Sequence, residues 1–388
     1  MSLLDIRQWN YPTRIVIGAG AIARLPDLCA AHGMSRVLFV TDKGLAEAPI
    51  LKKAVDAVPK GKLKAEVFSD VKGNPTESNV NSGLEVFRKG KFDGVVAFGG
   101  GSGLDAGKAI AFMAAQDRPL WDFEDVGDNW KRGKTEGLAP VIAVPTTAGT
   151  GSEVGRASVI GNEKTKDKKI IFHPAMMPKV ALCDPELTVG LPPHLTAATG
   201  FDAFTHCLEA FCAPGYHPMA EGVAMTGMRL CSQHLLDAIR DGRNVEARTH
   251  MMTAAIAGAT AFQKGLGGVH ALSHGIGAIY DSHHGLTNAV MLPYVLKANQ
   301  EAVWDQMLRI GRLLGLGDGG FEPVFDWMLK FREMAGIPHA ATALGCEESK
   351  AKEMGERAVK DPTAGGNPIP FDASEYSEIY LKACRGTL

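Results

Sequence analysis

Alternation of strand-like and helix-like segments is the feature that most restricts how the first half of this chain can fold. Apolar runs of about five residues, each bounded by Gly, Pro, Asp or Thr, have the length and composition of buried strands. The stretches between them are long enough for helices. This alternation indicates a mostly parallel sheet that helices cover on both faces. The expected strands are Arg14–Gly18, Arg36–Thr41, Ala65–Ser69, Gly94–Gly99 and Val141–Pro145, and the expected helices are Leu25–His32, Pro49–Val58, Glu77–Lys89 and Asp105–Ala115.

The pattern changes after about Pro192, where strand-like runs give way to longer helical segments. The segments favour helix by length and composition, and no comparable set of strands accompanies them. We therefore expect an α/β domain over residues 1–190, with a Rossmann-like parallel sheet, and an all-helical domain over 191–388. The expected helices of the second half are Leu195–Phe211, Glu221–Arg240, Val245–Lys264, Glu301–Leu314 and Pro323–Met334.

Charge and composition exclude several classes of partner. The 388-residue chain has a formal net charge of −2, so no basic field attracts nucleic acid or an anionic membrane. The Met1–Asn10 segment is neither cationic nor apolar enough for a signal peptide, and no apolar run is long enough for a membrane-spanning helix. The 7 cysteines are widely spread without paired CxxC patterns, which favours reduced, buried thiols. We expect a cytoplasmic globular protein.

Two glycine-rich segments follow expected strands, and either could bind the pyrophosphate of a dinucleotide. Gly18–Ala23 has the form G-x-G-x-x-A, and Asp42 follows at about the spacing of the Rossmann fingerprint. Gly99–Gly103 lies directly between an expected strand and an expected helix. Its glycines allow close approach to a phosphate, and the N-terminus of the helix attracts the anion. The placement favours the second segment, because Gly18–Ala23 is also typical of a tight turn.

Two further elements suit a nicotinamide dinucleotide. Asp42 follows the expected strand Arg36–Thr41, where its carboxylate could accept hydrogen bonds from the adenosine ribose. It would repel a 2′-phosphate and so favours NAD over NADP, although it could instead cap a turn. The loop Pro145–Glu153 also follows a strand and supplies hydroxyl and N–H groups for a sugar or an amide.

The second half contains a cluster of potential metal ligands. An Asp and a His lie four residues apart in an expected helix and so share one face. A His pair with the same spacing and then two adjacent His follow downstream, so that 4 of the chain's 12 His lie within 269–285. Neutral imidazoles with one carboxylate suit Zn²⁺ or Fe²⁺, and the spacing therefore predicts a divalent metal site. The residues are Asp202, His206, His270, His274, His283 and His284.

Together, these motifs resemble those of the iron-containing alcohol dehydrogenase family, from roughly Tyr11 to the C-terminus. The resemblance lies in several motifs: Gly99–Lys108 is similar to G-G-G-S-x-x-D-x-x-K, Pro145–Glu153 to P-T-T-x-G-T-G-S-E, Gly200–Glu209 to G-x-D-A-x-x-H-x-x-E, and Gly267–Gly285 to G-x-x-H-x-x-x-H-x₉-H-G, with Asn74-Pro75-Thr76 and Asn367-Pro368 as further landmarks.

The resemblance implies roles for individual residues. The implied metal ligands are Asp202, His206, His270 and His284, and the implied catalytic residue beside the nicotinamide and substrate is His274. The implied cofactor-binding residues are Asp42, Asn74, Gly99, Gly100, Gly101, Ser102, Asp105, Thr146, Thr147 and Lys168. Lys169 is an adjacent alternative to Lys168, and His283 has no role in the family.

The implied activity is that of a metal-dependent, NAD-linked alcohol dehydrogenase, with reversible hydride transfer between NAD and a small alcohol, diol or hydroxy acid. The first domain would then bind the dinucleotide and the second the metal. The family favours Fe²⁺, and Zn²⁺ or another divalent metal also suits the ligands. A homodimer or larger homo-oligomer is expected, with no nucleic-acid or membrane partner. Two alternatives are a lyase similar to dehydroquinate synthase and a non-enzymatic metal or nucleotide sensor. The lyase would need a cluster of basic residues, and no such cluster lies beside these His in the sequence.

The chain departs from the family pattern around the paired His. Gly275 stands where Pro is usual, and Gln263, followed by Lys264, stands where Asn is usual. These changes leave the ligand set intact but affect the expected shape of the substrate pocket. Lys264 at a pocket rim would favour a substrate with a carboxylate, or it would point to solvent.

Overall fold

The computed structural model describes residues 10, 11, 13–58 and 63–388. The expectation that Met1–Asn10 is no signal peptide therefore falls outside the described residues, except for Asn10. The chain forms two compact units, one from Tyr11–Thr147 and Gly151–Val189, the other from Gly190–Leu388 with Ala148–Thr150. We describe each unit by itself.

A six-stranded sheet is the centre of the first unit. All five strand pairings are parallel, as in the register Val37↔Gly94 and Val95↔Val141. The order places the glycine-rich strand β4 in the interior of the sheet. From edge to edge the strands are β1 (Arg14–Ile17), β8 (Val180–Cys183), β5 (Val141–Pro145), β4 (Gly94–Gly99), β2 (Arg36–Val40) and β3 (Lys64–Phe68).

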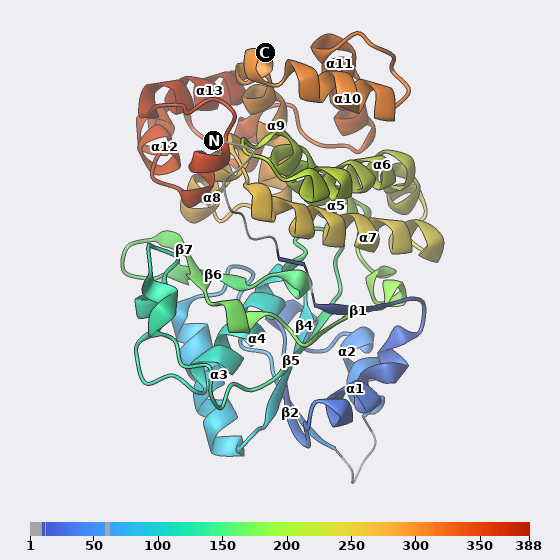
Figure 1. The fold of residues 1–388 in the computed structure, drawn as a ribbon, viewed down its shortest axis with the longest axis vertical. Helices are drawn as coiled ribbons and strands as arrows, with labels where there is room; N and C mark the ends of the chain where they lie inside the picture. Colours follow the sequence, from blue (N-terminus) through green and yellow to red (C-terminus); the bar gives the residue numbers. More distant parts are fainter. Residues whose placement is uncertain (1–9, 12, 59–62) are drawn as a thin grey trace. The chain divides into compact units, whose positions relative to one another are not determined.

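Helices cover both faces of this sheet, as Figure 1 shows. Side chains alternate along β4, so that Val95 and Ala97 belong to one apolar core and Val96 and Phe98 to the other. The first core includes α3 (Glu77–Gly90) and α4 (Gly101–Met113), and the second includes α1 (Leu25–Ala31) and α2 (Pro49–Asp56). The continuous apolar runs in the sequence reflect strands that are buried on both sides.

Three strands of this unit were not predicted. One is β8, a four-residue strand, and the other two form the antiparallel hairpin of β6 (Ala157–Asn162) and β7 (Asp167–Phe172). The β7 segment begins with three charged residues and is mostly half-buried, which hides it from a search for apolar runs. The predicted α/β class is nevertheless confirmed, because all five expected strands exist.

Helices make up the second unit, and none of the residues described from Gly190 onward lies in a β-strand. Two helices that matter for the site, α8 and α9, were not predicted. Their sequences contain several glycines and His, and α9 includes Pro293 in its interior, all of which lower intrinsic helix propensity. The helices are α5 (Pro193–Cys212), α6 (Pro218–Arg240), α7 (Val245–Ala261), α8 (Gly268–Tyr280), α9 (His284–Ala298), α10 (Trp304–Leu313), α11 (Phe321–Met334), α12 (Ala351–Ala358) and α13 (Ala373–Arg385).

Helix α5 is the central helix of this unit. Every residue from Thr196 to Cys212 is buried, and α5 packs against α6, α7 and α9. A helix that is buried on all sides can place polar side chains in the interior only where they have partners or a ligand. Among the described helices, none has the length and apolar character needed to cross a membrane.

Candidate metal centre and nucleotide site

Three helices bring the four predicted metal ligands together. Asp202 and His206 are one turn apart on α5, His270 lies on α8 and His284 begins α9. One possible ligand atom from each residue lies within 4.8 Å of the others. Asp202 Oδ1 is 3.9 Å from His206 Nε2 and 3.7 Å from His284 Nε2. Three imidazole nitrogens and one carboxylate oxygen form a donor set that fits Fe²⁺ or Zn²⁺.

A glycine allows α9 to start so close to α5. A Cβ atom on Gly285 would lie 2.5 Å from the carbonyl oxygen of Ala198 and 3.0 Å from Cβ of Asp202. Any side chain at this position would therefore push α9 away from α5. The small residue directly after His284 is what lets its imidazole reach Asp202.

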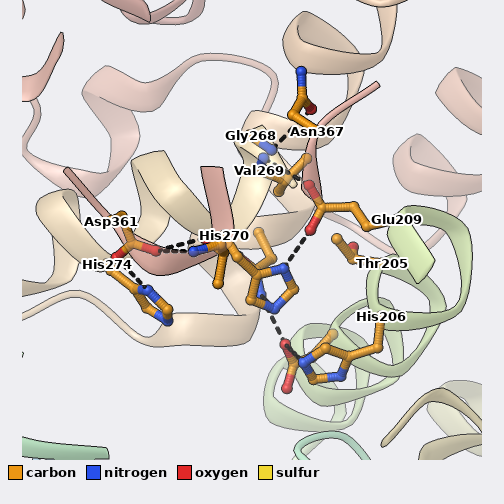
Figure 2. A network of polar contacts seen from close by, with 12 residues as sticks. Thr205, His206, Glu209, Gly268, Val269, His270, His274, Asp361 and Asn367 are labelled. Atoms are coloured by element: carbon orange, nitrogen blue, oxygen red, sulfur yellow. Dashed lines mark hydrogen bonds and ion pairs between the residues drawn. The ribbon is translucent and has the colours of Figure 1, made fainter. Parts of the chain in front are cut away.

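A buried carboxylate orients His270. Glu209 lies on α5, three residues after His206. Its carboxylate accepts a hydrogen bond from the backbone N–H of Val269 at 2.7 Å and lies 2.5 Å from His270 Nδ1 (Figure 2). Burial raises the pKa of Glu209 to about 7 and lowers the pKa of His270 well below its usual value. A proton on Nδ1 leaves the Nε2 atom of a neutral imidazole for the centre. Glu209 lies in the G-x-D-A-x-x-H-x-x-E motif, but its role was not predicted.

Asn288 is a second residue that the sequence reasoning missed. It lies one turn after His284 on α9 and is fully buried. Its Nδ2 atom is 2.8 Å from Asp202 Oδ1, 3.2 Å from His270 Nε2 and 3.1 Å from His284 Nε2. The four-residue spacing after His284 is the signal that could have identified it.

The structure places His274 next to the centre, where its hydrogen-bond partner is Asp361. Its Nδ1 atom is 2.8 Å from Asp361 Oδ2, and its ring stacks on that of His284 at 5.3 Å. Asp361 also accepts hydrogen bonds from the backbone N–H and the hydroxyl of Thr363. Burial acts to raise the pKa of Asp361, but the interactions with His274 and Thr363 outweigh it and the pKa lies below its usual value. No local spacing pointed to Asp361, which is far from His274 in sequence.

Neither His283 nor Lys264 belongs to the centre. His283 is exposed, and its Nδ1 atom accepts a hydrogen bond from the N–H of Leu286 as the N-cap of α9. The side chain of Lys264 is only 4% exposed and its Nζ atom is 3.1 Å from both Glu221 Oε1 and the carbonyl oxygen of Phe211. The lysine thus does not point into solvent but forms a partly buried ion pair with Glu221.

In the α/β unit, the turn between β4 and α4 has the expected glycine geometry. Gly99 has a φ of +137°, and a Cβ atom there would lie 3.3 Å from Asp42 Oδ2. Asp42 also caps a short helical turn, Lys43–Leu45, by accepting a hydrogen bond from Leu45 N–H. Burial raises the pKa of Asp42, although backbone N–H groups oppose this. Both interpretations of Asp42, the turn cap and the neighbour of the phosphate loop, are compatible with its position.

Several predicted cofactor residues contact one another in this unit. The hydroxyl of Ser102, in the first turn of α4, donates to the carbonyl oxygen of Gly73. The next residue, Asn74, accepts a hydrogen bond from Lys168 Nζ at 2.7 Å. Lys169 instead pairs with Glu124 at 2.7 Å. The alternation of side chains along β7 thus separates the two lysines and joins Lys168 to Asn74.

Asp105 connects helix α4 to the loop after β5 and to strand β6. Its Oδ1 atom accepts from Ser152 Oγ at 2.5 Å and lies 3.2 Å from Lys108 Nζ, while its Oδ2 atom accepts from Val159 N–H at 2.8 Å. Lys108 is buried and also donates to two carbonyl oxygens. The two threonines at the start of this loop follow directly from β5, with the N–H of Thr146 bonded to Gly99 O at 2.9 Å and Thr147 beside Gly100.

The other glycine-rich segment, Gly18–Ala23, already has a protein anion at its backbone. The N–H groups of Gly20 and Ile22 donate to the carboxylate oxygens of Asp184, each at 3.1 Å. The segment also follows β1, at the edge of the sheet. It is therefore a turn that Asp184 stabilises, which agrees with the preference for Gly99–Gly103 as the pyrophosphate-binding segment.

The first unit has a parallel sheet with a glycine-rich turn before a helix, as in dinucleotide-binding proteins. The second has an Asp and three His that suit a metal. Both features are typical of metal-dependent oxidoreductases that use a dinucleotide. Comparison with known proteins is more specific. The family model described as "Iron-containing alcohol dehydrogenase" matches residues 12–185, and the one described as "Fe-containing alcohol dehydrogenase family, C-terminal" matches 196–384. The chain belongs to the iron-containing alcohol dehydrogenase family.

Relatives of known activity match nearly the whole chain. A 4-hydroxybutyrate dehydrogenase of Cupriavidus necator is 39% identical over 95% of this chain and 97% of its own, and a 1,3-propanediol dehydrogenase of Citrobacter freundii is 35% identical over 98% and 100%. The crystal structure of a 1,3-propanediol oxidoreductase superposes with a TM-score of 0.92 at 35% identity, covering 97% of this chain and 100% of the other. The predicted class, an NAD-linked alcohol dehydrogenase of the iron type, is confirmed, and iron and NAD(H) are the cofactors of the family.

Proposed function

We propose that this alcohol dehydrogenase holds its metal with Asp202, His206, His270 and His284. The observation that carries the proposal is the convergence of four ligand atoms within 4.8 Å, from three helices of the second unit. When bound, the metal would supply Lewis acidity toward the alcohol oxygen, and NAD would supply the hydride acceptor. We propose the two units as the functional domains, the α/β unit for the dinucleotide and the helical unit for the metal.

The residues around the ligands prepare the centre. Glu209 fixes the orientation and tautomer of His270, because its two oxygens are held by Val269 N–H and by His270 itself. His274 donates from Nδ1 to Asp361 in the same manner, so its Nε2 atom stays free to accept a proton that leaves the substrate hydroxyl. Asp361 is then a positioning residue, and His274 is the candidate catalytic base.

For the cofactor, we propose that the backbone N–H groups of Gly99–Ser102 bind the pyrophosphate at the start of α4. Asp42 would accept hydrogen bonds from the adenosine ribose, and Thr146 and Thr147 would contact the cofactor from the neighbouring strand end. Asn74 and Lys168, which are hydrogen-bonded to each other, would lie toward the nicotinamide. Asp105 would act on the cofactor indirectly, because one of its oxygens holds the loop after β5 and the other holds strand β6.

We propose a small primary alcohol with a second polar end, a diol or a hydroxy acid, as the substrate. Support comes from the names of the similar proteins, which act on 4-hydroxybutyrate and 1,3-propanediol. Recognition of a carboxylate by Lys264 has no support, since this side chain is paired with Glu221. The cytoplasmic location and the homodimeric or larger assembly stay predictions, and light scattering of the purified chain would test the assembly.

The test is metal-restored turnover over an alcohol panel. Protein stripped of metal is given Fe²⁺ or Zn²⁺, and NAD⁺ reduction is followed with ethanol, butanol, 1,2- and 1,3-propanediol and 4-hydroxybutyrate. We expect restored turnover that His270→Ala abolishes and that His283→Ala preserves, because His283 only caps α9. Equal turnover in the two variants, or none with any metal despite tight NAD binding, would refute the proposed centre.

Turnover also tests the proposed role of His274. We expect His274→Ala to lower turnover strongly while the metal content stays near that of the unaltered protein. Full turnover in this variant would refute the role as proton acceptor.

A further inference from the structure

The amide of Asn288 occupies the middle of the ligand set. Its nitrogen contacts a ligand atom on each of three helices: Asp202 on α5, His270 on α8 and His284 on α9, at 2.8–3.2 Å. The residue is fully buried in the interior of the unit. An NH₂ group has two hydrogens, so in the absence of a cation it can donate to two of these three atoms at a time.

The other end of the same amide has no role in this arrangement. Among the residues that the structure describes, Asn288 Oδ1 is buried without a hydrogen-bond partner. A buried carbonyl that makes no hydrogen bond has lost its contact with water and gained nothing in return. Such a cost is unusual in a closely packed helix interior, and each case calls for an explanation, such as a missing ion.

Rotation about the last side-chain bond exchanges the two ends of a carboxamide, which have nearly the same size. With the nitrogen inward, the amide can donate to the carboxylate and to one imidazole at a time. With the oxygen inward, it presents a lone pair to a cation and turns its N–H groups away from the positive charge. The favoured orientation therefore depends on whether a divalent metal is bound.

We propose that Asn288 is a fifth ligand of the metal centre, with its NH₂ group turned to the other ligands in the metal-free protein and its carbonyl oxygen turned to the metal in the loaded protein. The proposal rests on the proposed metal ligands. An added neutral oxygen donor makes the set three nitrogens and two oxygens, which suits the higher coordination of Fe²⁺ better than a tetrahedral Zn²⁺ site.

Two substitutions at this position separate a ligand from a packing residue. Asn288→Asp keeps the size and supplies an anionic oxygen, but it removes the N–H groups and puts a second carboxylate beside Asp202. Metal-free Asn288→Asp should therefore melt at a lower temperature than the unaltered protein, while its affinity for metal rises. Asn288→Ala removes both functions, so its melting temperature without metal and its affinity for metal should both fall, the latter by about 10–100-fold.

The control is another buried amide at the opposite end of the same helix. Asn299, the C-cap of α9, exchanges hydrogen bonds with Asn367 at 2.9 Å and contacts none of the four ligands in the described interactions. Asn299→Asp should lower the melting temperature of the metal-free protein with no gain in metal affinity. It thus reports what a buried amide-to-acid change does to stability alone.

The experiment uses the full-length protein, stripped of metal, with Co²⁺ alone as the probe. Affinity is measured by competition with a chelator and stability by thermal melting without metal. Tighter Co²⁺ binding by Asn288→Asp together with weaker binding by Asn288→Ala supports the proposal. Unchanged or weaker binding by Asn288→Asp, or unchanged binding by Asn288→Ala, overturns it. If the unaltered protein and His270→Ala bind Co²⁺ alike, the metal centre itself is refuted and the proposal for Asn288 falls with it.

Discussion

Each unit contains a network of buried polar side chains, and the two networks are completed in different ways. In the α/β unit, the two oxygens of Asp105 are matched by donors from Ser152, Val159 and Lys108. In the helical unit, four potential ligand atoms converge, and the NH₂ group of Asn288 is shared among three of them. A matched network contributes to the stability of the fold, whereas converging acceptors are completed by a cation. Substitutions in the first should cost unfolding free energy, and substitutions in the second should cost metal affinity.

The largest expected effect is on the matched network. Asp105→Ala leaves the buried ammonium group of Lys108 without its carboxylate, and breaking a buried ion pair in this way costs about 3–5 kcal/mol. Urea unfolding of the metal-free protein, without NAD, measures the loss. The control Asp122→Ala removes an exposed ion pair with Arg118 in the same unit, which contributes at most about 1 kcal/mol. If the two variants unfold alike, Asp105 does not stabilise the fold in the manner described.

A buried glutamate in the same unit gives a pH-dependent effect. Burial raises the pKa of Glu153 to about 7. The unfolded chain loses this proton near the ordinary value of 4.5, so the folded protein binds more protons between these values and its stability falls as pH rises. Above about pH 7 both states are ionised and the full loss is present.

Glu153→Gln removes this titration and should stabilise the protein progressively from pH 4.5 upward, by at most roughly 3 kcal/mol at pH 8. Chemical unfolding at a series of pH values measures the difference. Glu85→Gln changes an exposed glutamate on α3 and should leave the pH dependence as it is. A constant difference between Glu153→Gln and the unaltered protein at all pH values would contradict the interpretation.

The corresponding change in the helical unit should act on the metal. Glu209→Gln keeps an acceptor for Val269 N–H but presents an amide N–H to His270 Nδ1, which drives the imidazole proton to Nε2 and away from the ligand form. We expect Co²⁺ affinity to fall by about 10–100-fold, as for other partners of ligating His. Competition with a chelator gives the affinity. Unchanged affinity would mean that Glu209 has no part in orienting His270.

The same difference explains what the sequence could reveal about the fold. The strands β4 and β5 were predicted to the residue, because both of their faces are buried and their sequences are apolar throughout. The hairpin strand β7 was missed because its partly exposed sequence is charged. Helix α9 was missed because its stability comes from packing against α5 and not from its own propensity.

For the site, helical spacing was informative and tertiary position was not. Asp202 and His206 are one turn apart, so their common face could be deduced from the sequence. The pairing of His274 with Asp361 spans 87 residues and depends on how the chain returns after α12. The burial of Lys264 against Glu221 was also beyond reach, because it depends on packing between α6 and the end of α7.

The smallest effect that we predict concerns the selectivity of the α/β unit, where Asp42 has two possible roles. As a cap, its oxygen accepts from Leu45 N–H, and as a neighbour of Gly99 its charge repels a 2′-phosphate.

Asp42→Asn keeps the acceptor and the size but removes the charge, whereas Asp42→Ala removes all three. If charge matters, both variants should raise the ratio of kcat/KM for NADP over NAD by about tenfold, or ~1.4 kcal/mol, because a carboxylate near the phosphate is lost in each. If Asp42 is a cap alone, Asp42→Asn should leave the ratio unchanged, and Asp42→Ala should only destabilise the protein, by about 0.5–2 kcal/mol. Steady-state kinetics with each cofactor, beside thermal melting of both variants, decides between a side chain that selects the cofactor and one that shapes the turn.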